Sequence, residues 1–255
     1  MYSGEHTIRA ICDLWRVAEA RLKETLDKRH VNEEYITIEM CGEFDETLKA
    51  NVEEIREAIN IDLGLHGYQL ENPYLPLLAQ SQLYSKKREG HIGADFGILL
   101  SLPDPLQNIT LKRAILCQAK IQGKNGKWGK FTPRQKKRLP SRLRYLGIIG
   151  YSFEDVSARK RLNSITCIDC SKNDQLPTLN NLNLYEHSRI TIPQMIEALA
   201  SGSIGSSDRN VIAEIVEGDL PYVNIEIAFP EDGGGQRVIL TSEQSHHIHV
   251  SVTED

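Results

Sequence analysis

Three polar side chains in two apolar segments have the types and spacing that suit a divalent cation. Asp95 opens one apolar run, and Gln118 and Lys120 lie two positions apart in the next. Because side chains alternate between the faces of a strand, Gln118 and Lys120 project from the same face. Mg²⁺ prefers oxygen ligands, here the Asp95 carboxylate, the Gln118 amide oxygen and the backbone carbonyl at position 119. The spacing therefore predicts a metal-dependent phosphodiesterase site on two neighbouring strands.

The remaining groups of such a site have to come from nearby elements. Lys120 fits beside the metal, where it would orient or help deprotonate the attacking water and offset charge in the transition state. A second carboxylate is expected from an early helix that packs on the sheet. Glu34 and Glu33 are the best placed, and Glu39, Glu43 and Glu46 are the alternatives. Glu89 is either an extra ligand or a supporting residue.

The hydrophobic pattern predicts the elements that hold these residues. Apolar side chains recur at helical spacing over residues 6–29, and Asn32 is a candidate N-cap for a second helix to about residue 60. Residues 63–81 are rich in glycine and proline and predict loops. Strands are expected at 83–86, 94–100, 113–122, 145–151 and 164–170, with a hairpin through Pro103 and Pro105. Short helices are expected at 134–139 and 192–199, a loose linker at 201–207, and strands at 222–229, 237–241 and 247–252.

Length and composition bound the organisation of the chain. With 255 residues, 40% hydrophobic and 25% charged, it is one large domain or one domain with an appendage. We expect residues 1–200 to form an α/β domain and residues 201–255 a C-terminal β-rich extension, which alternatively belongs to the same domain. No apolar run is long enough to span a bilayer, no signal peptide is recognised, and the five cysteines are an odd number. These features predict a cytoplasmic protein without a membrane partner.

The net charge of −5 conceals a strongly uneven distribution. Residues 105–153 hold 12 of the 30 basic residues and none of the 35 acidic residues. A basic segment on an acidic body is typical of contact with a phosphate backbone. The expected nucleic-acid contacts are Lys124, Lys127, Lys130, Arg134, Lys137 and Arg138, with Gln135 beside them. The alternatives are a solvated loop or a docking face for an acidic partner protein.

Other candidate residues are weighed against ordinary structural roles. Trp128 either stacks on DNA or, as we favour, packs against the domain. Cys167 and Cys170 form a single C-x-x-C in an apolar run, which is not enough for structural zinc. His246, His247 and His249 are expected on a surface strand rather than at a metal. No Walker A motif is present, so ATP hydrolysis is not expected.

Residues 33–37, 89–95 and 118–120 together resemble, in this order, motifs of the PD-(D/E)xK nuclease superfamily, also called restriction-endonuclease-like. The likeness is greatest to the Mrr-type branch, whose last motif reads Q-x-K, and it covers roughly residues 30–151. Two positions depart from the usual pattern. Gln118 replaces a carboxylate, which weakens metal binding and disfavours a two-metal site, and Ala94 stands where a proline usually precedes the aspartate.

The resemblance implies a restriction-endonuclease-like mixed β-sheet flanked by helices and a Mg²⁺- or Mn²⁺-dependent DNA endonuclease activity. The catalytic residues would be Glu34 (or Glu33), Asp95, Gln118 and Lys120, and the metal ligands Glu34, Asp95 and Gln118. It further implies an effector subunit of a bacterial antiphage defence system, with an ATPase or sensor partner or self-association. The alternative is an inactive module in which Asp95 and Lys120 form a buried salt bridge and the chain binds nucleic acid or an acidic protein.

Overall fold

The computed structural model describes most of the chain. Its described residues are 4–26, 32–70, 72, 74, 76–84, 94–107, 109–122, 127–156, 159–172, 175, 189–217, 220–229 and 240–242. Among the residues in these ranges, no helix is both long and apolar enough to cross a membrane.

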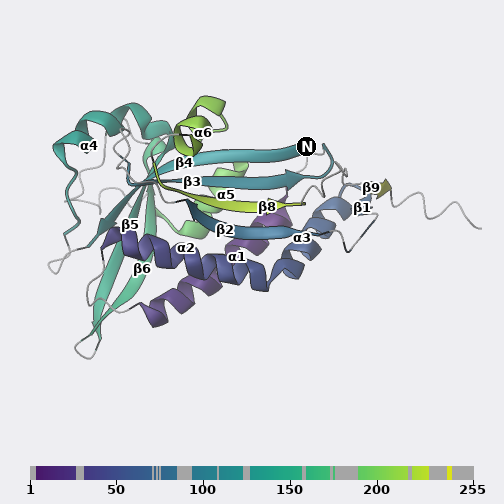
Figure 1. Ribbon diagram of the computed structural model, residues 1–255, viewed down its shortest axis with the longest axis horizontal. Coiled ribbons are helices and arrows are strands. Elements are labelled where there is room, and N and C mark those ends of the chain that lie inside the picture. The colour runs from purple at the N-terminus through teal and green to yellow at the C-terminus, as the bar shows by residue number, and fades with distance from the viewer. Residues whose placement is uncertain are drawn as a thin grey trace, which may run out of the picture.

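The protein has a mixed α/β fold built on a seven-stranded sheet in the order β2-β8-β3-β4-β5-β6-β7 (Figure 1). The strands of this sheet are β2 (Leu78–Tyr84), β3 (Phe96–Asp104), β4 (Ile109–Ile121), β5 (Leu146–Val156), β6 (Arg159–Asp169), β7 (Arg189–Ile190) and β8 (Tyr222–Ala228). Two further strands, β1 (Tyr68–Leu70) and β9 (Leu240–Ser242), pair antiparallel with each other at the opposite end of the molecule from α4 (Figure 1). The sheet is mixed because β4–β5 and β3–β8 are parallel and the other pairs are antiparallel.

Helices cover both faces of the sheet and create two hydrophobic cores. The helices are α1 (Glu5–Thr25), α2 (Glu33–Ala50), α3 (Val52–Gly64), α4 (Pro133–Arg138), α5 (Ile192–Ser201) and α6 (Arg209–Val216), with 3-10 helices at Leu139–Tyr145 and Cys170–Lys172. Alternation along β4 separates the cores: Ile115 packs with α1, α2 and α5, whereas Leu116 packs with Trp128 and α6. A strand buried on both faces explains why this part of the sequence is a continuous apolar run.

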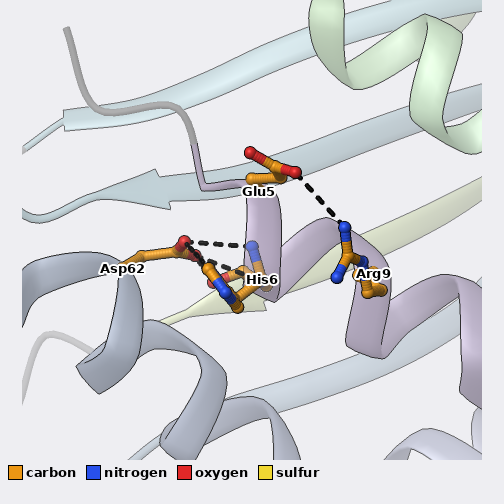
Figure 2. A network of polar contacts seen from close by, with 5 residues as sticks. Glu5, His6, Arg9 and Asp62 are labelled. Atoms are coloured by element: carbon orange, nitrogen blue, oxygen red, sulfur yellow. Dashed lines mark hydrogen bonds and ion pairs between the residues drawn. The ribbon is translucent and has the colours of Figure 1, made fainter. Parts of the chain in front are cut away.

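The long N-terminal helix α1 is fastened to α3 by one buried carboxylate (Figure 2). Asp62 accepts hydrogen bonds from the backbone N–H groups of His6 and Thr7 at 3.0 and 2.9 Å, and from the Thr7 hydroxyl at 2.7 Å. His6 Nδ1 lies 3.0 Å from the same carboxylate. These are the first-turn N–H groups that have no partner inside a helix, so Asp62 caps α1 from a distance of 55 residues along the chain.

The helices and strands expected around the site are confirmed, but the first half of the chain contains three differences. The second predicted helix is two helices, because Asn51 interrupts it. The Asn51 side-chain Nδ2 donates a 2.8 Å hydrogen bond to the Thr47 carbonyl. The region expected as loops contains β1 and most of β2, whose few large apolar residues gave a weak strand signal. Pro103 lies inside β3 rather than in the turn. Its missing N–H is tolerated because β8 pairs with β3 only as far as Ser101.

The second half of the chain differs in how its tail is used. The segment expected as a loose linker is packed: Ile204 is buried, and Ser206 exchanges two 2.8 Å backbone hydrogen bonds with Ala114 of β4. Helix α6 follows it and was not expected. The predicted strand at residues 222–229 exists, as β8, but it lies inside the sheet between β2 and β3. The sequence from residue 201 therefore completes the central sheet, and the expected strand at 247–252 is outside the described residues.

Candidate functional site

The register of the β3–β4 hairpin brings Asp95 opposite Gln118. Phe96 pairs with Cys117, and the Asp95 N–H continues the ladder with a 3.0 Å bond to the Cys117 carbonyl. Asp95 Oδ2 then accepts hydrogen bonds from the Gln118 side-chain Nε2 and, at 2.9 Å, from the Ala119 N–H. The carboxylate and the amide that the sequence predicted as neighbours are therefore in direct contact.

The Gln118 side chain is completely buried, and only its nitrogen has a hydrogen-bond partner. Its Nε2 atom donates to Asp95 and lies 3.4 Å from the Ala119 carbonyl. Its Oε1 atom has no hydrogen-bond partner and no exposed surface. A buried carbonyl oxygen without a partner costs roughly 1–3 kcal/mol, so native structures keep few of them. An amide oxygen of this kind next to a carboxylate is a suitable ligand for a hard cation.

Burial and neighbouring charges act on the pKa of Asp95 in opposite directions. Asp95 is exposed as a residue, but its carboxyl group is partly buried against Gln118 and Ala119, and this burial raises its pKa above the usual range. The Lys120 ammonium and the hydrogen bonds from Gln118 and Ala119 lower that pKa without fully offsetting burial, and Glu33 adds a second negative charge that raises it. Lys120 itself is buried, with Nζ 5.9 Å from the centre of the Phe131 ring. A positive charge placed near Asp95 would therefore stabilise the charged carboxylate.

The second carboxylate that the structure brings to this place is Glu33, and Glu34 lies elsewhere. Glu33 Oε1 accepts a 3.2 Å hydrogen bond from the Ile121 N–H, at the end of β4 directly after Lys120. Glu34 is exposed on the outer side of α2. Of the two first-turn glutamates named from the sequence, only Glu33 is within electrostatic range of Asp95.

The periodicity of α2 places Glu33, rather than Glu34, beside its buried face. Ile38, one turn after Glu34, is 44% exposed. The buried face begins instead with Ile36, Thr37 and Met40, three, four and seven residues after Glu33. A frame built on these residues would have selected Glu33. The Asn32 cap itself is confirmed, since its side chain accepts from the Tyr35 N–H at 2.8 Å.

The segment after β4 folds back over Lys120. Trp128 forms an isolated bridge with Gln122, and its ring lies against Gly150 of β5 so closely that a Cβ there would be 2.6 Å from it. Gly129 follows, and a Cβ at this position would meet Lys120 Cδ at 3.4 Å and Glu33 Oε1 at 3.9 Å. Trp128 thus packs against the domain, as favoured from the sequence, and brings Gly129 next to two of the candidate site residues.

Most of the predicted nucleic-acid contacts are exposed at the surface. Lys127, Lys130, Arg134, Lys137 and the neighbouring Lys136 are exposed, whereas Arg138 is half-buried. Gln135 has a structural role, because its side chain and its backbone N–H form the capping box of α4 with Thr132. Lys124 and Glu89 lie outside the described residues.

The cysteines and histidines add no second site to the described part of the chain. All five cysteines are free and buried, and burial raises the pKa of Cys12 to about 11 and that of Cys167 to about 12. Among the residues that the structure describes, no group of three or more His, Cys, Asp and Glu side chains is close enough to hold a metal ion. The candidate site accordingly has two carboxylates and depends on amide and backbone oxygens for its other ligands. His246, His247 and His249 are outside the described ranges.

No protein-family model, no curated protein and no solved structure matches this chain.

Proposed function

We propose that this protein is a Mg²⁺- or Mn²⁺-dependent DNA endonuclease whose site is formed by Glu33, Asp95, Gln118 and Lys120. The observation that carries the proposal is the completely buried Gln118 side chain, whose Nε2 atom donates to the Asp95 carboxylate and whose Oε1 atom has no hydrogen-bond partner, two residues before the buried Lys120. Buried polar groups without partners and carboxyl groups with shifted pKa values concentrate at functional sites.

The donor set fits a hard cation. Asp95 Oδ2 and the Ala119 carbonyl both lie near the Gln118 amide group, whose oxygen and nitrogen exchange places by rotation of the amide. The three oxygens would hold the ion, and it would polarise the phosphate and lower the pKa of a bound water. Lys120 would orient that water and offset the negative charge that develops on the phosphate. Glu33 would supply the second carboxylate near the end of β4.

The surroundings of the site support nucleic acid as the substrate. The exposed cations of residues 127–137 follow the strand that carries Gln118 and Lys120, in a part of the chain without acidic residues. Phosphate contacts of this kind hold a backbone without reading its sequence. A mixed sheet with helices on both faces also agrees with the restriction-endonuclease-like resemblance, although folds of this type host many activities. Assignment to an antiphage effector with an ATPase or sensor partner, or to a homo-oligomer, rests on the resemblance alone.

A plasmid-nicking assay with Mg²⁺, Mn²⁺ or EDTA tests the proposal. We expect metal-dependent cutting by the wild type and none by Asp95→Ala or Lys120→Ala. Glu33→Gln and Glu34→Gln are a matched pair, because they remove the same charge from adjacent positions of one helix. Cutting should fall about 10²-fold or more in Glu33→Gln and stay within about twofold in Glu34→Gln. Equal cutting by the wild type and the Asp95 and Lys120 variants would refute the assignment.

The alternative is a nuclease-like module that binds nucleic acid without cleaving it. The observation in its favour is that Asp95 already has two hydrogen-bond donors and a lysine nearby, and that among the described residues Glu33 is the one carboxylate found beside it. This reading predicts salt-sensitive DNA binding, weakened by Lys130→Ala and Lys137→Ala, with no cutting under any metal.

A further inference from the structure

A short chain of hydroxyl groups connects the core of the sheet to the carboxylate-bearing turn of α2. The Tyr151 hydroxyl of β5 lies 2.9 Å from Thr37 Oγ1, and Thr37 Oγ1 donates a 2.8 Å hydrogen bond to the backbone carbonyl of Glu33. Tyr151 is completely buried and Thr37 is 5% exposed. Neither side chain belongs to the proposed catalytic site or to the exposed basic residues.

The direction of the chain follows from the number of protons. A threonine hydroxyl has one proton, and Thr37 gives it to the Glu33 carbonyl, so Tyr151 must be the donor to Thr37. Burial raises the pKa of Tyr151 far above its ordinary value. Burial thus favours the protonated phenol, which is the form that donates to Thr37.

The hydrogen bonds close into a ring that includes the end of β4. The Glu33 carboxylate accepts from the Ile121 N–H at 3.2 Å, Ile121 pairs with Tyr151 across β4 and β5, and the Gln122 N–H donates to the Tyr151 carbonyl at 2.9 Å. The Tyr151 side chain thus connects to the backbone of Glu33 through Thr37. The Tyr151 backbone pairs with the end of β4, the strand that donates to the Glu33 carboxylate. A shift of the first turn of α2 would break this ring.

We propose that Tyr151, acting through Thr37, is the positioning residue that holds the Glu33 carboxylate at the end of β4 beside Lys120. The value of this placement for metal binding rests on the proposed function, but the placement itself does not. Neither hydroxyl touches the reacting atoms. Their part is to prevent fraying of the first turn of α2, which would carry Glu33 away from the strand.

The test measures the Ile121 amide directly, by hydrogen exchange followed by NMR in wild type and Tyr151→Phe. Loss of the phenol hydroxyl should accelerate exchange at Ile121 about five- to tenfold, because the Glu33 acceptor is released. The Gly97 amide, which donates to the Pro221 carbonyl at 2.9 Å in β3, is the internal reference and should change by less than about twofold.

Three further variants separate positioning from general loosening. Thr37→Val should reproduce the Tyr151→Phe result, and Thr37→Ser should restore wild-type exchange at Ile121. Ser152→Ala is the matched control, since it removes a hydroxyl from the next residue of β5, where it bonds only Ser164 at 2.6 Å. Unchanged Ile121 exchange in Tyr151→Phe, or an equal acceleration in Ser152→Ala or at Gly97, would overturn the inference.

Calorimetric titration with Mn²⁺ then distinguishes this inference from the proposed function. If the wild type binds Mn²⁺, Tyr151→Phe should weaken binding about five- to tenfold through the displaced Glu33, and equal affinity would overturn the value of this placement for metal binding. If the wild type binds no Mn²⁺, the proposed function fails, while the Ile121 exchange rates still decide whether Tyr151 positions Glu33.

Discussion

Asp62 and Asp95 are two aspartates that hold backbone N–H groups, and their surroundings push their pKa values in opposite directions. Burial raises the pKa of both, but at Asp62 the hydrogen bonds from His6 and Thr7 outweigh burial and lower it. At Asp95 burial outweighs Lys120 and the bonds from Gln118 and Ala119. The hydrogen bonds to Asp62 compensate for its burial, whereas those to Asp95 do not.

The difference is the one expected between a structural site and a functional site of the kind we propose at Asp95. Every contact at Asp62 favours the charged, folded arrangement, as is usual where natural sequences are locally consistent. At Asp95 two carboxylates, a buried lysine and an amide oxygen without a partner are held together at a cost to stability. Such conflicts are expected where function, rather than folding, selects the residues. Stability measurements can therefore test the functional reading without any substrate.

The largest effect should come from removing the structural carboxylate. Asp62→Ala leaves the first turn of α1, including the buried Thr7, without its cap and removes these hydrogen bonds between α1 and α3, so we expect a loss of about 2–4 kcal/mol in the free energy of unfolding. Urea denaturation followed by circular dichroism measures it. Asp13→Ala, which breaks only an exposed ion pair with Arg16, should change stability by less than about 0.5 kcal/mol. Equal losses in both variants would contradict the capping role.

The sequence revealed the composition of the candidate site better than its geometry. Asp95, Gln118 and Lys120 could be placed together because strand alternation and a hairpin are local properties. The sequence left both Glu33 and Glu34 open, because two adjacent first-turn residues differ only in which side of the helix packs on the sheet, and the contact of Glu33 with the Ile121 N–H favours Glu33. The role of Tyr151 depends on contact between residues 114 positions apart, which no local pattern encodes.

The same distinction applies to the fold. The amphipathic α1 and the apolar strands β4, β5 and β6 carry strong local signals, and their existence was predicted. The position of β8 between β2 and β3 is decided by tertiary packing, because a seven-residue strand has the same pattern at an edge as inside a sheet. The cap that Asp62 provides for α1 was missed for a similar reason, since its partners are 55 and 56 residues away.

An intermediate effect on the free energy of unfolding is expected from Asp→Asn substitutions at positions 62 and 95, measured as a function of pH without metal. Asp62 has a lowered folded-state pKa, so its contribution is present above the unfolded value of about 3.9 and is lost as the pH falls through the folded value. Asp62→Asn should thus lose about 1–2 kcal/mol at pH 7 and less below pH 4. Asp95 has a raised pKa, so its favourable contribution exists at low pH and is lost as the pH rises through the folded value.

Asp95→Asn should therefore be more stable than the wild type at pH 7 in EDTA, and this advantage should shrink as the pH falls toward 4. Urea titrations of both variants between pH 4 and pH 7.5 give the comparison, with the wild type in the same buffers as the reference. Opposite signs at pH 7 would sharpen the contrast between the two carboxylates. A loss of stability in Asp95→Asn equal to that in Asp62→Asn would mean that Asp95 is another structural anchor.

The smallest effect on stability is expected at Gln118, the amide ligand in the proposed cation site. Gln118→Met keeps the volume of a completely buried side chain, deletes the hydrogen bond to Asp95 and also deletes the oxygen that has no partner. The two changes oppose each other, so the free energy of unfolding in EDTA should move by less than about 1 kcal/mol. Millimolar Mn²⁺ should raise the melting temperature of the wild type and leave that of Gln118→Met unchanged, because an ion stabilises only the state that binds it. A large loss in EDTA would make Gln118 a structural residue, whereas a neutral substitution that removes the Mn²⁺ response would identify its amide oxygen as a ligand.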